Sequence, residues 1–132
     1  MNRATLESWT LRVLRIVTGC MFALHGAQKL FGALTTRAPV ELLSQKGLGG
    51  VIELAGGALI ALGLYTRPAA FLSAGTMAVA YIQFHWKLEL GERFLPIVNG
   101  GELAVIYCFV LLWFAVHGAG PASLDAIGGR RR

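Results

Sequence analysis

The sequence predicts an all-α membrane protein in which four transmembrane helices form an antiparallel bundle, and three observations lead to this fold class. The 132-residue chain is 55% hydrophobic and 14% charged, whereas soluble domains are about 45–50% apolar and about 25% charged. Four stretches approach the roughly 20 apolar residues of a membrane-spanning helix. They lie near residues 9–31, 48–65, 69–86 and 97–117. A chain this short has too little surrounding structure to bury four helices that are apolar on all sides.

The first stretch is expected to be a transmembrane helix and not a secretory signal, because it is too long and shows no small-residue cleavage site before Lys29. The second and third stretches are separated only by residues 66–68, so they form a tight helical hairpin in which Pro68 opens the third helix. Glycine and alanine recur along both helices of this hairpin. We therefore expect the second and third helices to cross closely.

The longest connection, residues 33–47, is expected to hold a short helix between the first and second transmembrane helices. Pro39 suits a first helical position, and Glu41 suits the first turn. Lys46 suits the last turn and Gly47 the position beyond it. Two leucines in the middle indicate that this helix lies in the plane of the membrane interface.

The distribution of lysine and arginine predicts that both termini are cytoplasmic. Seven basic residues fall on the side of the termini, and five fall on the other side. The seven are Arg3, Arg12, Arg15, Arg67, Arg130, Arg131 and Arg132, the last three within a basic C-terminal tail over residues 126–132. We expect Arg12 and Arg15, near the start of the first helix, to extend toward the lipid headgroups.

Apart from the cytoplasmic arginines and His117, the strongly polar residues within the apolar stretches fall at the helix ends that an antiparallel bundle brings to its extracytoplasmic side. They are His25, Gln28, Lys29, Glu53, Gln83, His85, Asn99 and Glu102. The first three share a helix face at spacings i, i+3 and i+4, and Asn99 and Glu102 share another. Because an ionisable group inside an apolar span is costly without a partner, we expect these side chains to turn inward and form one polar site.

Four motifs resemble the DoxX family of small four-helix membrane proteins. They are HGAQKLFG at 25–32, GVIELAGGALIALGLYTRPAA at 50–70, NGGELAVIY at 99–107 and GAGPASLD at 118–125. The resemblance covers about residues 12–125 and implies a single domain over residues 1–132. It also implies a multi-pass protein of the bacterial inner membrane. The family's polar positions correspond here to His25, Lys29, Glu53, Arg67, Asn99 and Glu102.

Described members of the family are subunits of quinone-linked oxidoreductases, including thiosulfate:quinone oxidoreductase, or components of membrane redox and stress-response complexes. The leading hypothesis is therefore a quinone-interacting membrane subunit of an oxidoreductase. Glu53 or Glu102 would be its candidate catalytic residue and would handle a proton. A quinone or substrate site would be formed by His25, Gln28, Lys29, Glu53, His85, Asn99 and Glu102.

The alternative hypothesis is a non-catalytic accessory subunit that docks onto a larger membrane complex. In that case a Lys-Glu or His-Glu pair would only hold the helices together. A small-solute transporter is less favoured, because the sequence has no visible inverted repeats or broken helices. The expected partners are the lipid bilayer, other membrane subunits or a second copy of the chain, and nucleic acid is excluded because the basic residues flank apolar segments.

No cofactor is evident from the sequence, although a quinone fits the resemblance. Axial haem ligation by His25 and His85 is a minor alternative. No metal site is expected, because no ligand cluster has the required spacing. Cys20 and Cys108 lack a C-x-x-C pattern and are interpreted as two buried small hydrophobic residues.

Overall fold

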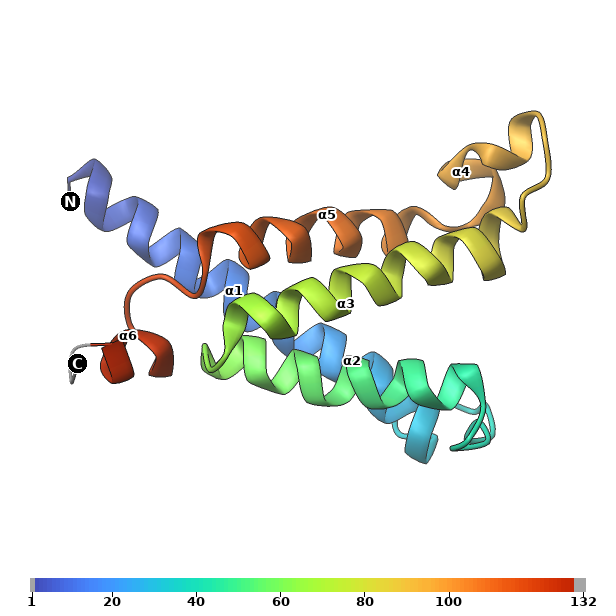
Figure 1. The fold of residues 1–132 in the computed structure, drawn as a ribbon, viewed down its shortest axis with the longest axis horizontal. Helices are drawn as coiled ribbons and strands as arrows, with labels where there is room; N and C mark the ends of the chain where they lie inside the picture. The colour runs from blue at the N-terminus through green and yellow to red at the C-terminus, as the bar shows by residue number, and fades with distance from the viewer. Residues whose placement is uncertain (1, 130–132) are drawn as a thin grey trace.

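A computed structural model describes residues 2–129 of the protein, and over this range the chain consists of helices and loops without a strand (Figure 1). The all-α fold class predicted from the sequence is confirmed. The helices are α1 (Arg3–Phe31), α2 (Gln45–Leu62), α3 (Thr66–Ala80), the π-helix η1 (Tyr81–Trp86), the 3-10 helix η2 (Glu92–Phe94), α4 (Pro96–Asn99), α5 (Glu102–His117) and α6 (Leu124–Gly129). The arginines at 130–132, which form most of the predicted basic tail, lie outside the described residues.

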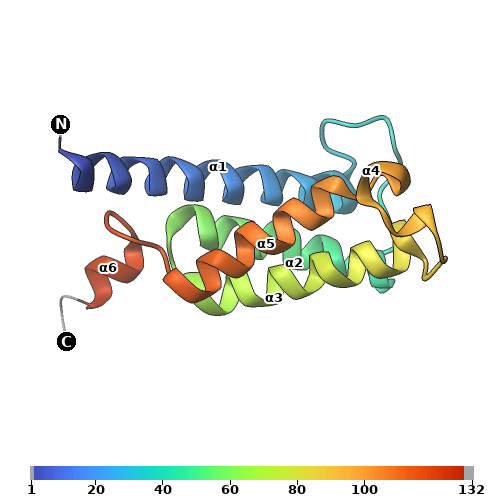
Figure 2. The ribbon, with the colours of Figure 1, turned by 90° about the horizontal axis from the view of Figure 1, so that it is seen from above.

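The four long helices lie along the longest axis of the molecule, and α1 packs most extensively against α2 whereas α3 packs most extensively against α5 (Figure 1). Contacts between α2 and α3 join these two pairs. The view in Figure 2 shows α5 crossing over α2 and α3, with α1 along one edge. The start of α1 and the short helix α6 lie at the same end of the bundle (Figure 1).

Over residues 2–129, none of the helices is at once long enough and apolar enough to cross a membrane. The four transmembrane helices therefore stay a prediction.

The boundaries of all four long helices differ from the predicted ones. Helix α2 covers Gln45–Leu62 and not 48–65, and α3 begins at Thr66, so the prediction that Pro68 opens it is wrong and Pro68 lies in its first turn.

Two of the differences have clear local reasons. Helix α1 begins at Arg3 because the side chain of Asn2 accepts a hydrogen bond from the backbone N–H of Thr5 and caps it. The predicted stretch 97–117 is divided, because Gly100 adopts φ 73° and ends α4 after one turn. Helix α5 starts afresh at Glu102.

The predicted short helix between the first two long helices is wrong. Residues 38–44 form loop and turn, and Ser44 caps α2 by accepting a hydrogen bond from the N–H of Gly47 at 3.0 Å. Lys46 and Gly47 thus belong to the first turn of α2 and not to the end of a separate helix. Gly47 is required there because a Cβ would meet the backbone carbonyls of Glu41 and Leu42.

The closest helix contact joins α1 to α2, and not α2 to α3 as the small residues of the hairpin suggest. A Cβ added to Gly19 would meet the backbone of Gly57 and Ala61, and one added to Gly57 would meet the backbone of Gly19 and Ala23. Between α2 and α3 the corresponding contact is with a side chain, because Gly56 faces Ser73. We call the backbone contact between Gly19 and Gly57 the glycine seam.

Arg15 lies inside the bundle, and the expectation that it extends toward lipid headgroups is wrong. Its side chain is 1% exposed and donates hydrogen bonds to the carbonyl oxygens of Ile60, Ala61 and Ala122. The last carbonyls of a helix have no partner within that helix, so a buried guanidinium at the end of α2 satisfies them. Arg15 therefore joins α1, the end of α2 and the loop before α6.

Asp125 holds the same end of the bundle from the C-terminal side. Its carboxylate accepts hydrogen bonds from the backbone N–H groups of Tyr65 at 2.8 Å and Thr66 at 3.0 Å, at the start of α3. Partial burial would raise the pKa of Asp125, but these hydrogen bonds and the nearby Arg15 guanidinium outweigh it and hold the pKa below its ordinary value. The C-terminal segment is thus fixed to the turn between α2 and α3.

We expect Gly57→Ala to lower the melting temperature of the purified protein in detergent, because the added methyl group would press against the backbone of α1. Overpacking of this kind costs about 1–3 kcal/mol and exceeds the gain in helix propensity of about 1 kcal/mol. Gly75→Ala is the matched control, since a Cβ there meets nothing within 4 Å. Equal melting temperatures for the two variants would contradict the close backbone contact at the glycine seam.

The lowered pKa of Asp125 predicts a pH dependence of stability. A depressed carboxyl pKa stabilises the fold above the ordinary carboxyl value, and this contribution is lost as pH falls through the lower folded pKa. We expect Asp125→Ala to be less stable than the unmodified protein at neutral pH, with the difference shrinking in acid. Thermal unfolding measured across an acidic pH series checks this, and a pH-independent difference would contradict it.

Candidate functional site

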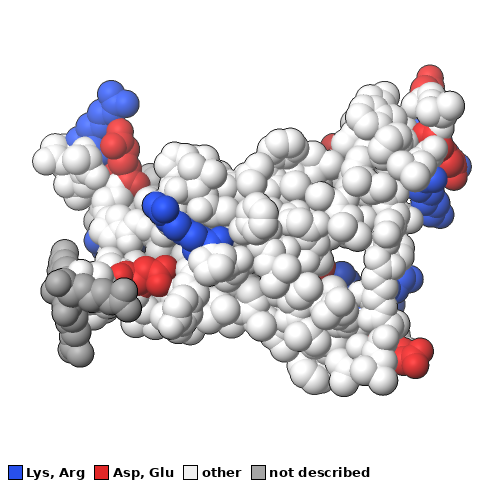
Figure 3. Space-filling view, viewed as in Figure 1, with Lys and Arg blue, Asp and Glu red and all other residues white. Residues whose placement is uncertain are grey.

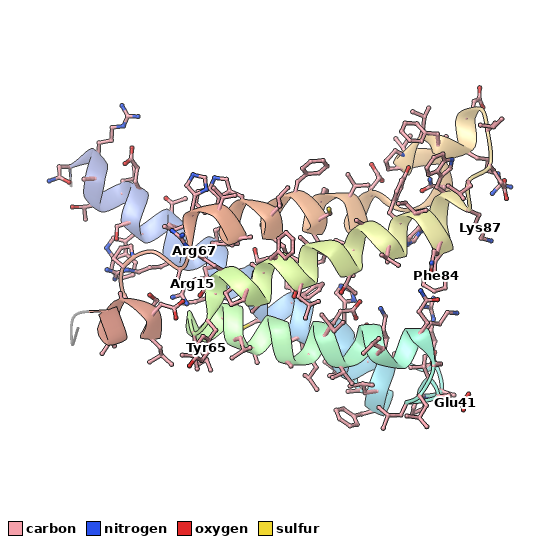
Figure 4. All side chains as sticks on the ribbon, viewed as in Figure 1. Arg15, Glu41, Tyr65, Arg67, Phe84 and Lys87 are labelled. Carbon is pink, nitrogen blue, oxygen red and sulfur yellow. The ribbon has the colours of Figure 1, made fainter. Side chains whose placement is uncertain are left out.

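A cavity of about 1010 Å³ lies at the end of the bundle opposite the chain termini. Its walls come from the end of α1, the loop between α1 and α2, the first half of α2, and α3 from Phe71 onward with η1. Figure 4 labels Glu41, Phe84 and Lys87 near this end and Arg15, Tyr65 and Arg67 near the other. Figure 3 shows the surface hollowed at this end, with basic side chains visible in the hollow.

Five of the residues predicted from the sequence line this cavity: His25, Gln28, Lys29, Glu53 and His85. The rest of the lining is mainly apolar and includes Ile52, Phe71, Leu72 and Val79, together with the basic residues Arg37 and Lys46. The cavity therefore combines an apolar surface with a few polar groups, as small-molecule sites do.

An ion pair between α1 and α2 forms one wall of the cavity. Lys29 Nζ lies 2.5 Å from Glu53 Oε1, and the two side chains are 38% and 2% exposed, respectively. The pair forms because Gly50 lets α2 approach the Cβ of Lys29, one turn before Glu53. Glu53 Oε2 is buried and has no hydrogen-bond partner among residues 2–129.

His25 connects the cavity to the interior of the bundle. Its ring meets the ring of Tyr107 edge to face, with centroids 6.0 Å apart. Tyr107 also packs against Phe22 at 5.2 Å, and its hydroxyl group is buried without a partner in the described part of the chain. The sequence analysis missed Tyr107, although it is the one phenol in the otherwise apolar run of α5.

The π-helix η1 closes the cavity on the side of α3. His85 lies in η1, with Nδ1 3.5 Å from the carbonyl oxygen of Asn99. The side-chain amide of Gln45 donates a hydrogen bond to Gln83, and Lys46 Nζ lies 5.4 Å from the centroid of the Phe84 ring. These two contacts join the start of α2 to η1, and π-helical turns of this kind are frequent at functional sites.

Asn99 and Glu102 do not line the cavity. The amide of Asn99 donates to Tyr81 Oη at 3.2 Å and to the carbonyl oxygen of Arg93 at 2.9 Å, so it organises the loop before α5. Glu102 is exposed in the first turn of α5. The expectation that Glu102 turns inward beside Asn99 is wrong, because Gly100 breaks the helix and the two residues do not share a face.

Other singled-out residues also lie away from the cavity. Arg67 is exposed at the opposite end, beside Gly118, and exposed His117 stacks on Trp113 with ring centroids 4.2 Å apart. Cys20 and Cys108 are free thiols. Cys20 is exposed, so its interpretation as a buried hydrophobic residue is wrong. Over residues 2–129, no three His, Cys, Asp or Glu side chains gather as a metal site would require.

The arrangement offers two kinds of hydrogen bond to a molecule in the cavity. Lys29 and the amide of Gln28 supply donors, whereas Glu53 Oε2 is an acceptor that has no partner among the residues that the structure describes. The apolar walls suit a hydrophobic ring or chain. A ligand with an apolar body and both carbonyl and hydroxyl oxygens would match these groups.

Comparison with known proteins agrees with the motifs. The sequence model of the DoxX family matches residues 10–86, which span most of α1, all of α2 and α3, and η1. The chain is 41% identical to an uncharacterised protein of Haemophilus influenzae, and the match covers 94% of each chain. No solved structure matches. The chain belongs to the DoxX family, and this membership indicates a small membrane protein.

Proposed function

We propose that this DoxX protein is an integral membrane subunit of an oxidoreductase complex and that its cavity binds a quinone. The observation that carries the proposal is the position of Glu53. One carboxylate oxygen is paired with Lys29 at 2.5 Å, and the other is buried without a partner in the wall of a cavity of about 1010 Å³. An ionisable group in such a position is a candidate functional group.

The surface supports the membrane part of the proposal. Large apolar side chains are exposed on every long helix, including Val17 on α1, Leu62 on α2, Phe71 on α3 and Phe109 on α5. On the face shown in Figure 3, charged side chains gather mainly toward the two ends of the longest axis, with a broad uncharged region between them. Contiguous exposed apolar surface of this kind is typical of contact with lipid or with another membrane subunit.

The excess of basic residues on the side of the termini favours a cytoplasmic position for both termini in the bacterial inner membrane. The cavity would then lie beneath the extracytoplasmic surface. A long-chain quinone, which partitions into the bilayer, would reach it from the lipid. The electrons for quinone reduction would come from another subunit of the complex, with which this chain would assemble.

The cavity groups fit the two oxidation states of a quinone. Lys29 and His25 would donate hydrogen bonds to the carbonyl oxygens of the oxidised form. Glu53 Oε2 would accept a hydrogen bond from a hydroxyl group of the reduced form, and the same carboxylate would take or release a proton. The apolar walls, including Phe71 and Val79, would hold the ring.

A second candidate is the non-catalytic accessory subunit, and the Lys29–Glu53 pair also favours it. This pair joins α1 to α2 at the end where Arg15 and Asp125 are not present to hold the helices. If its role is only structural, the loss of the pair would affect folding and nothing else. The two functions therefore predict different effects of substitutions at Lys29 and Glu53.

We expect Glu53→Gln to weaken the binding of a short-chain ubiquinone by about 10–100-fold, because an amide replaces the charged acceptor at nearly the same size. Binding would be measured by titration of the purified protein in lipid nanodiscs. Glu7→Gln is the control, since this carboxylate lies in an exposed pair with Arg3 near the start of α1. Unchanged binding by correctly folded Glu53→Gln protein would contradict the quinone site.

A combination of two substitutions separates a binding site from a structural pair. Lys29→Met alone would leave a buried carboxylate without its cation, at a cost of about 3–5 kcal/mol. Lys29→Met combined with Glu53→Gln removes both charges, so we expect its melting temperature to recover while quinone binding stays weak. Recovery of both stability and binding would exclude a chemical role for the pair and favour the accessory subunit.

A further inference from the structure

Three buried polar side chains from three different helices lie near the centre of the bundle. Glu53 of α2, Ser73 of α3 and Tyr107 of α5 are 2%, 0% and 6% exposed. Each has a side-chain oxygen without a hydrogen-bond partner in the described part of the chain. We call these three residues the central polar cluster.

Helix packing places the members of this cluster at one level. Ser73 Oγ faces Gly56, which is one turn after Glu53 on α2. Tyr107 contacts the rings of Phe22 and His25 on α1, beside the positions where Ala23 and Gly26 of α1 meet α2.

Three unpaired oxygens at one level in an apolar core would be costly, because each buried polar group without a partner costs about 1–3 kcal/mol. Internal water removes this cost where two to four polar groups surround it. Glu53 accepts hydrogen bonds, and the hydroxyls of Ser73 and Tyr107 both donate and accept. We propose that the central polar cluster binds internal water and that this water connects Glu53 to the cavity but to nothing beyond the cluster.

The opening toward the cavity follows from the lining residues. Both Glu53 and His25 line the cavity, and His25 also contacts Tyr107. Of the titratable groups on this side, Lys29 pairs with Glu53, His25 shares the cavity wall with it, and Tyr107 contacts His25. Helix α3 contributes the uncharged Ser73. A proton from the cavity side could therefore reach Glu53 through titratable side chains and through bound water.

The path ends at an apolar layer on the other side of the cluster. Ile60, Ala70, Leu111 and Phe114 are each 0% exposed and belong to one apolar core. The next buried hydroxyl on the same face of α3 is Thr66, seven residues and about 10 Å away along the helix. No polar group of α3 bridges this gap on that face, so the hydrated site is closed along α3. On α1, the buried Thr18 lies one turn before Phe22 and is the polar residue next to the apolar layer.

This inference rests on the proposed function in one respect: the hydrated cluster would give a bound quinone its proton and would exchange that proton with the cavity end alone. On reduction, the quinone would take two electrons from the partner subunit and two protons. Each proton would first be taken up by the Glu53 carboxylate from the cavity end and then passed to a quinone oxygen, which returns Glu53 to the ionised form paired with Lys29. The apolar layer prevents the same proton from passing to the cytoplasmic end.

X-ray radiolytic labelling tests the proposal, because water bound inside a protein causes rapid hydroxylation of adjacent buried side chains. Phe22 and Phe114 form a matched pair of reporters, being 1% and 0% exposed. Phe22 packs against Tyr107 at 5.2 Å, whereas Phe114 belongs to the apolar layer. We expect Phe22 to be labelled severalfold faster than Phe114 in the full-length protein in nanodiscs.

Substitutions identify the groups that hold the water. We expect Ser73→Ala and Tyr107→Phe each to slow the labelling of Phe22 toward the rate of Phe114. Thr66→Val is the control, since it removes a buried hydroxyl outside the cluster and would leave the labelling of Phe22 unchanged. Circular dichroism and the melting temperature establish that each variant is folded, and Ser73→Ala, which removes a single oxygen, serves if Tyr107→Phe does not fold.

Equal slow labelling of Phe22 and Phe114 would overturn the proposal, as would rapid labelling of both residues, which would mean that water passes the apolar layer. Ubiquinone titration of the same samples separates this inference from the proposed function. Quinone binding with a dry cluster would overturn only the inference. A hydrated cluster without quinone binding would overturn only the proposed function.

Discussion

The close approach of α1 and α2 is the constraint on which the candidate site depends. Gly19 and Gly57 bring the two backbones together so closely that neither position has room for a Cβ. Farther along the same interface, this approach brings Lys29 to 2.5 Å from a carboxylate that is 2% exposed. A charge so deeply buried persists only beside an opposite charge, so the site exists because the helices touch.

The two ends of the bundle are built differently. At the end of the bundle where the termini lie, Arg15 and Asp125 form hydrogen bonds to backbone groups at the end of α2 and the start of α3. The C-terminal segment is thereby held against the turn between these helices. At the other end, α2 and η1 meet through the flexible side chains of Gln45 and Gln83, with a cavity of about 1010 Å³ behind them. One end therefore fixes the helices while the other leaves space for a ligand, a division that suits a binding protein.

Helical periodicity and antiparallel order are enough to predict much of the polar site. The i, i+4 spacing of His25 and Lys29 and the position of Glu53 in the next helix predict that these three residues belong to one site. All three line the cavity, and Lys29 pairs with Glu53. The prediction for Glu102 is wrong because one helix ends before Gly100 and Gly101 and another begins after them. This break depends on backbone conformation, which a hydropathy pattern does not report. The prediction for Arg15 is wrong because its carbonyl partners lie 45 or more residues away in sequence. Its position near the start of an apolar helix indicates only a side chain that extends toward the lipid headgroups.

The unequal exposure of Lys29 and Glu53 would couple ligand binding in the cavity to hydrogen bonding inside the bundle. Lys29 is 38% exposed, so a carbonyl oxygen in the cavity can compete for its ammonium group without first removing it from a closed site. Glu53 is 2% exposed and cannot turn to bulk water when its cation is shared. Its carboxylate would then need another donor, and the central polar cluster offers the hydroxyl of Tyr107 on α5 and any water bound there. A ligand that binds Lys29 would thereby change the hydrogen bonding of α5, which it does not touch.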